Sequence, residues 1–139
     1  MEKLKRFGVS MEEELLKRFD KFIKSKKYPN RSEAIRDLVR NALVEEQWEK
    51  KSGEVIGVLV IIYDHHKREL SSALLKKEHR HTNKILTTIH IHLDSKNCLE
   101  AKVIKGKPEE VRKIADELIA MKGVKFGRLV PAATGNKML

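Results

Sequence analysis

The order of apolar segments after Gly53 constrains the fold of this 139-residue chain more than any other feature. The expected elements are, in sequence order, a strand at 55–63, a helix at 69–79, strands at 84–94 and 98–105, a helix after Gly106-Lys107-Pro108, and a strand at 124–133. The order β-α-β-β-α-β is the split βαβ, or ferredoxin-like, motif. This part of the chain is therefore predicted to be an α+β domain built on one sheet.

The first fifty residues have a different pattern, which predicts one short strand followed by two helices. Ser10-Met11-Glu12-Glu13 and Asn30-Arg31-Ser32-Glu33 both have the spacing of a capping box, so a helix is expected to begin at each. Pro29 separates the two helices because proline disfavours the helical conformation in the residue before it. Lys50-Lys51-Ser52-Gly53 has the composition of a linker. The expected domains are residues 1–51 and 52–139.

The short strand expected at 3–9 has no partner strand within the first fifty residues. Two copies pairing antiparallel would form a two-stranded ribbon flanked by four helices, and such a ribbon can enter the major groove of DNA. The outward-facing residues would be Arg6, Gly8 and Ser10. Arg6 could then bind guanine through its fork of donors.

Two further features favour an anionic partner. Asn30, Arg31 and Ser32 begin the second helix, where free backbone N–H groups could hold a phosphate. The formal net charge is +10, and an excess of this size is typical of proteins that bind nucleic acid. We therefore expect the first domain to bind DNA.

Three potential metal ligands lie close together in the sequence: His90, His92 and Cys98. The two histidines are two residues apart on an expected strand, so their imidazoles point to the same face. Cys98 is the only cysteine of the chain and has no intrachain disulfide partner. Imidazole and thiolate groups are strong ligands for late first-row metals, and the pattern therefore predicts a metal site.

The side chains also predict the register of this hairpin. If His92 lies opposite Cys98, then His90 lies opposite Glu100, and these four side chains share one face. The other face then carries Ile89, Ile91, Leu93, Leu99, Ala101 and Val103. We expect the apolar face to pack under the helices and the histidine face to meet solvent or another subunit.

The hairpin would supply three metal ligands and one carboxylate, that of Glu100. Glu100 could accept the free ring N–H of a ligating histidine and so fix its tautomer. A fourth ligand must come from elsewhere, and the remaining histidines are His65, His66, His79 and His81.

The chain from Arg6 to about Leu129 resembles the nickel-responsive ribbon-helix-helix repressors of the NikR family. The resemblance is carried by Asn30-Arg31-Ser32-Glu33-Ala34-Ile35-Arg36-Asp37 and by the spacing of His90, His92 and Cys98, followed by Leu99-Glu100. It implies an N-terminal ribbon-helix-helix domain and a C-terminal ACT-like domain that binds nickel. It also implies a homotetramer, a dimer of dimers, that binds a double-stranded DNA operator.

The resemblance also implies roles for individual residues outside the hairpin. The fourth nickel ligand would come from a neighbouring subunit and falls on His79, with His81 as a rival. Tyr63, His65 and Glu100 match positions around the nickel site.

A second cation site would map to Glu33 and Asp37, with backbone oxygens near Ile119, Met121 and Val124. Lys67 and Arg68 would contact the DNA backbone. Gly8 departs from the polar residue that better-known relatives carry at this step of the ribbon.

The expected function is a nickel-dependent transcriptional repressor that binds a palindromic operator and controls nickel uptake. The alternatives are a metal-storage or delivery protein, and a regulator that senses an amino acid through an ACT-like domain. An enzyme is not expected, because four protein ligands would leave the metal no open position for a substrate. A single cysteine without an export signal or membrane-spanning segment favours the cytoplasm.

Overall fold

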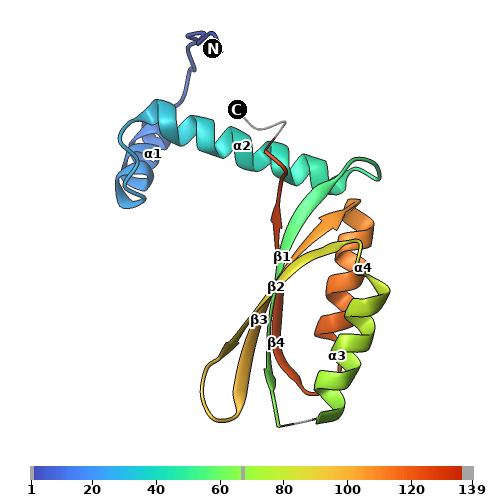
Figure 1. The fold of residues 1–139 in the computed structure, drawn as a ribbon. Helices are drawn as coiled ribbons and strands as arrows, with labels where there is room; N and C mark the ends of the chain where they lie inside the picture. Colours follow the sequence, from blue (N-terminus) through green and yellow to red (C-terminus); the bar gives the residue numbers. More distant parts are fainter. Residues whose placement is uncertain (1, 67, 136–139) are drawn as a thin grey trace. The chain divides into compact units, whose positions relative to one another are not determined.

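A computed structural model describes residues 2–66 and 68–135 of the chain (Figure 1). The elements are α1 (Glu13–Ser25), α2 (Arg31–Glu49), β1 (Val55–Asp64), α3 (Arg68–Arg80), β2 (Ile85–His92), β3 (Asn97–Gly106), α4 (Pro108–Ile119) and β4 (Val124–Ala132). The chain divides into two compact units, Met1–Val39 and Arg40–Leu139, and the division falls within α2. Among the described residues, no helix combines the length and the apolar character that crossing a bilayer requires.

Of the two helix caps predicted in the first unit, one is present and the other is not. At the second, the Glu33 N–H donates to Asn30 Oδ1 at 2.8 Å, so this cap is confirmed. At the first, the prediction that Ser10 caps the helix is wrong. The cap position is Glu12, and α1 begins at Glu13 without a side-chain cap hydrogen bond. Glu13 and Glu14 place negative charge in the first turn instead, where it interacts favourably with the helix dipole.

The segment before α1 forms no strand within this single chain, in the described residues 2–12. Its apolar side chains are exposed, with Leu4 at 84 %, Phe7 at 76 % and Val9 at 60 %. A strand needs a neighbour for its backbone groups, and no other segment among the described residues pairs with this one. Pairing of this segment with a second copy stays a prediction.

The second unit is the expected β-α-β-β-α-β arrangement. Its four strands form one antiparallel sheet in the order β2-β3-β1-β4. Helices α3 and α4 lie on the same side of this sheet (Figure 1). The core between helices and sheet contains Trp48, Val55, Leu59, Ile61, Tyr63, Leu70, Leu74, Cys98, Ile104, Val111, Ile114, Ala115 and Leu118. The fold class predicted from the element order is thus confirmed.

The hairpin of β2 and β3 has the predicted register but the opposite orientation. His92 pairs with Cys98, and His90 pairs with Glu100. However, Cys98 is fully buried on the helix-covered face, whereas Ile89 and Ile91 are 54 % and 48 % exposed on the open face. The expectation that the apolar face packs under the helices is therefore wrong.

The orientation of the sheet is decided outside the hairpin. β1 is apolar on both faces, so its own composition selects neither. Glycines provide room on the covered face: a Cβ at Gly57 would lie 3.1 Å from Val111 of α4, and one at Gly127 would lie 2.5 Å from Ile119. Helix α4 can therefore approach only this side closely. The pairing of Tyr63 with Cys98 then places the cysteine beneath the helices.

Candidate metal centre

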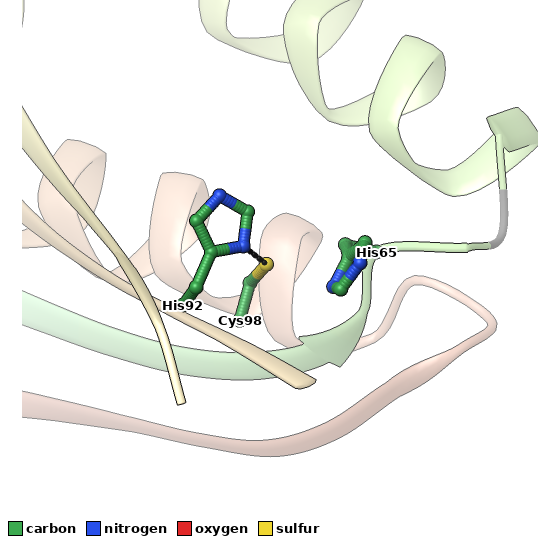
Figure 2. Close-up of side chains that lie close together, drawn as sticks. All are labelled: His65, His92 and Cys98. Atoms are coloured by element: carbon green, nitrogen blue, oxygen red, sulfur yellow. Dashed lines mark hydrogen bonds between the residues drawn. The ribbon is translucent and has the colours of Figure 1, made fainter. Parts of the chain in front are cut away.

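Three side chains with metal-binding atoms converge at the end of the hairpin: His65, His92 and Cys98 (Figure 2). One potential ligand atom from each lies within 4.8 Å of the other two. Cys98 Sγ is 3.3 Å from His92 Nδ1. His65 Nδ1 is buried and has no hydrogen-bond partner within the described part of the chain. A buried, unpartnered imidazole nitrogen beside a thiol fits a cation better than it fits an apolar core.

The turn between β2 and β3 brings these side chains together. Leu93 N–H donates to the Asn97 carbonyl at 2.9 Å, which closes the hairpin directly beyond His92. Asp94 Oδ1 accepts the N–H groups of Lys96 and Asn97, each at 2.8 Å. The hydrogen bond from the Asn97 side chain, together with these two backbone bonds, lowers the pKa of Asp94 to about 2. The ionised Asp94 thus fixes the turn that sets His92 opposite Cys98.

His65 reaches the site through the same turn. Its backbone N–H donates to the Lys96 carbonyl at 2.9 Å, which ties the loop after β1 to the hairpin. The ring of the neighbouring His66 lies 4.3 Å from that of His65 between centroids, and its Nδ1 is 3.6 Å from Asp64 Oδ1. Sequence analysis named both histidines as candidate ligands, but only His65 lies in the cluster.

His90 lies beside the cluster, next to Glu100. Its ring centroid is 5.0 Å from that of His92, and its Nδ1 is 3.8 Å from Glu100 Oε1. Tyr63 meets the His90 ring edge-on with 6.3 Å between centroids. Burial and the Glu100 carboxylate raise the pKa of Tyr63 above its ordinary value, so its hydroxyl stays protonated. The predicted histidine pair therefore shares one face, but the group whose potential ligand atoms all lie within 4.8 Å of one another contains His65 and not His90.

Two polar groups of this site are adapted to a ligand that carries positive charge. Burial, with the nearby carboxylates Glu100, Asp94 and Asp64, raises the pKa of the Cys98 thiol. Glu100 Oε2 is buried and has no hydrogen-bond partner among the described residues. A bound cation would satisfy this oxygen and take the place of the thiol proton.

The two rival histidines near the end of α3 have different surroundings. His79 is exposed in the last turn of the helix. It borders a hollow of about 260 Å³ that Glu78, Thr82 and Ile85 also line. His81 is 22 % exposed, and its Nε2 is 3.3 Å from Glu117 Oε2. The structure thus leaves His79 accessible and engages His81 within the chain.

The comparisons with known proteins place this chain in a family. Residues 56–132 match the model described as the NikR C-terminal nickel-binding domain, and residues 5–46 match that of the ribbon-helix-helix proteins of the copG family. The chain belongs to the NikR family. The family resemblance and the ribbon-helix-helix domain inferred from the sequence are thereby confirmed.

Relatives of similar length share about half of the residues of this NikR-family chain. One from Geobacter sulfurreducens is 53 % identical over 96 % of both chains. One from Caldanaerobacter subterraneus is 49 % identical over 99 % of this chain and 90 % of its own length. Both carry the name "Putative nickel-responsive regulator". A solved structure of an uncharacterized protein from Thermotoga maritima has a TM-score of 0.52 at 15 % identity. It covers 57 % of this chain and 98 % of its own, and shows a shared fold alone.

The predicted DNA contacts of the ribbon-helix-helix domain lie on its surface. Arg6, Gly8 and Ser10 are exposed, as are Asn30 and Ser32. Arg31 is also exposed, but its guanidinium forms two hydrogen bonds of 2.8 Å with the carboxylate of Asp20. This partner was not anticipated from the sequence, and a phosphate at the start of α2 would compete with it.

The other predicted DNA contacts are Lys67 and Arg68, and the carboxylates of the predicted second cation site lie in the first unit. Lys67 lies outside the described residues, and Arg68 is the first residue of α3. Glu33 forms an ion pair with Arg36 at 2.6 Å. Asp37 accepts a hydrogen bond from the Tyr28 hydroxyl. Both carboxylates thus have partners within the first unit.

Proposed function

We propose that this chain is a nickel-dependent transcriptional repressor that binds a palindromic DNA operator when nickel is bound and controls nickel uptake. The proposal rests on one observation above others: a histidine and cysteine cluster lies in the NikR C-terminal domain of a chain that also has a ribbon-helix-helix domain. The names of the curated relatives support the same function. Membership of a family of regulators agrees with the expectation that the chain is not an enzyme.

We infer that His90, His92 and Cys98 bind nickel together with His79 of a second copy, while Tyr63, His65 and Glu100 surround the ion. Nickel would supply a Lewis-acid centre that joins the hairpin of one copy to α3 of another. The exposure of His79 and the engagement of His81 with Glu117 support this choice of fourth ligand.

A second ligand set is supported by the cluster within the single chain. There, His65 lies with His92 and Cys98, and His90 lies beside Glu100. The two sets can be separated with His65→Ala and His90→Ala. The variant that loses most nickel affinity identifies the ligand, and anomalous scattering at the nickel edge would show the atoms directly.

The open face of the sheet supports self-association. Ile89, Ile91, Phe126 and Val130 are each between 45 % and 54 % exposed there. These residues lie on β2 and β4, the two outer strands of the sheet, and exposed apolar side chains grouped on one face favour a protein interface. We propose that it is buried in a homotetramer, and that two N-terminal segments pair as the DNA-reading ribbon.

Trans donation by His79 can be tested by mixing His79→Ala subunits with Cys98→Ala subunits. Each variant alone lacks one ligand, whereas a mixed assembly contains some complete sites. Recovered nickel binding in verified mixed assemblies would support donation in trans. Absence of recovery in such assemblies would argue that His79 is not a ligand from another copy.

The regulatory function is tested by footprinting on DNA fragments with and without nickel. A protected palindrome that appears only with nickel would support the repressor. Nickel binding without any specific footprint would favour the storage or delivery protein. A footprint that depends on an amino acid instead of nickel would favour a metabolite sensor.

A further inference from the structure

Lys102 is a lysine that the structure buries completely. It lies on β3 between Leu59 and Thr88 of the neighbouring strands, and its side chain has 0 % exposure. By strand alternation it shares the helix-covered face with Cys98 and Glu100. Lysine is almost never fully buried unless its charge is paired. Its partners therefore indicate what it does.

The Lys102 ammonium connects two carboxylates from different elements. It forms an ion pair with Glu78 on α3, and its Nζ is 3.4 Å from Glu100 Oε1 on β3. Glu100 in turn contacts the metal centre, since the same Oε1 lies 3.8 Å from His90 Nδ1. Glu78 directly precedes His79 in the chain. A continuous polar connection thus runs from the strand-borne histidines to the last turn of α3.

The packing of α3 shows why this connection matters. Leu70 and Leu74 anchor its first half and are only 4 % and 2 % exposed. From Leu75 to Arg80, no residue of α3 is buried, and this part of the helix borders the hollow of about 260 Å³. The ion pair of Glu78 therefore holds the part of α3 that has the least apolar support.

An apolar residue at position 102 would fill the same buried space without the cost of desolvating a charge. A buried ion pair is therefore weak evidence for stability, and in some proteins such groups select one arrangement of the elements. The charge of Lys102 joins α3 to β3 through Glu78 and Glu100.

We propose that Lys102 is a positioning residue that holds the last turn of α3, and with it His79, on the sheet before nickel binds. This inference rests on the proposed nickel site, but its first test needs no metal. Lys102 contacts no proposed ligand itself and acts through Glu78 and Glu100.

The test is hydrogen exchange on the full-length, metal-free protein, comparing wild type with Lys102→Met. The amides at the end of α3 should exchange at least about fivefold faster in the variant, because local opening becomes easier. The amides of β1 and β3 should keep their protection. Unchanged or slower exchange at the end of α3 would overturn the proposal.

Lys105→Met is the matched control. Lys105 lies on the same strand, is 41 % exposed, and forms an ion pair with Glu54 at 3.4 Å. Its loss should leave α3 unaffected. Should Lys102→Met fail to fold, Glu78→Gln removes the charge from a side chain that is 21 % exposed, and the same acceleration is expected.

Nickel titration gives a second readout that a purely structural role would not produce. Lys102→Met should bind nickel roughly tenfold more weakly yet keep the sulfur-to-nickel absorption band, because outer partners tune a site without supplying ligands. Nickel should restore slow exchange in α3. Loss of the band would show that Lys102 is required for the ligands themselves and would overturn the positioning role. If wild-type protein bound no nickel, the proposed function would fail, while the metal-free exchange result would still decide the role of Lys102.

Discussion

The two units of the chain differ in how much of their fold one copy completes. The second unit has a four-stranded sheet, two helices and a continuous core within a single chain. The first unit has α1 and the first part of α2 but few buried apolar residues, and the segment before α1 is exposed and unpaired within the described residues. The second unit is thus a complete domain with one apolar face open, whereas we predict that the first unit completes its domain by pairing with a second copy. If both units self-associate as proposed, association would complete the fold of the first unit and cover the open face of the second.

The largest expected effect comes from placing a charge on the open face of the second unit. Ile91→Lys would bury an unpaired ammonium if this face is covered in the assembly, at a cost of roughly 3–5 kcal/mol per ion. The variant should dissociate to smaller species in sedimentation experiments while its circular dichroism stays native. A control is Lys96→Ala, at an exposed turn position. An unchanged assembly in Ile91→Lys would show that the open face is not the interface.

The next largest effect is expected on nickel affinity, from a change at Cys98 on the helix-covered face of the sheet. Cys98→Ala should weaken nickel binding by about 100-fold or more, since loss of even an outer partner costs about 10- to 100-fold. The sulfur-to-nickel absorption band should disappear, which titration followed by absorption spectroscopy would show. Ser95→Ala, in the nearby exposed turn, serves as the control. Retention of the band in Cys98→Ala would exclude the thiolate as a ligand.

A smaller effect is expected where the first unit meets DNA. Arg6→Ala should cost about 1–3 kcal/mol on the operator and relax the preference at one base pair. Its outward-facing neighbours Gly8 and Ser10 are small, so Arg6 carries most of the capacity to read a base. Competition binding over a panel of operator variants would measure this. An equal loss of affinity for operator and random DNA would make Arg6 a phosphate contact only.

The sequence predicted those parts of the fold that depend on local chemistry. The hairpin register followed from pairing His92 with Cys98, and Asp94 and Asn97 form the turn that enforces it. The orientation of the hairpin could not be predicted, because it depends on how closely α4 approaches Gly57 and Gly127 in other strands.

Two features of the site depend on contacts between segments that are distant in the sequence, and they could not be predicted. Lys102 has the pattern of a solvent-facing strand residue, but the orientation of the sheet places it on the helix-covered face, where it pairs with Glu78 and Glu100. His65 was one candidate ligand among several, because the hydrogen bond that draws it toward Cys98 comes from Lys96 of a distant turn. The sequence predicted that histidines and the one cysteine lie together. It did not predict that His65, His92 and Cys98 form the tightest group.

The smallest expected effect concerns the two helix starts of the first unit, where one capping signal is used and the other is not. Asn30 Oδ1 accepts the Glu33 N–H, so Asn30→Ala should destabilise the folded first unit by about 1 kcal/mol. Ser10→Ala is the matched control, because α1 begins at Glu13 without a side-chain cap and Ser10 has no capping role. Urea unfolding followed by circular dichroism would measure both variants at one protein concentration, since stability of an associating unit depends on concentration. A loss in Ser10→Ala equal to that in Asn30→Ala would mean that the start of α1 changes when two copies pair. The first unit would then acquire even its helix boundaries from its partner, which would strengthen the contrast with the second unit.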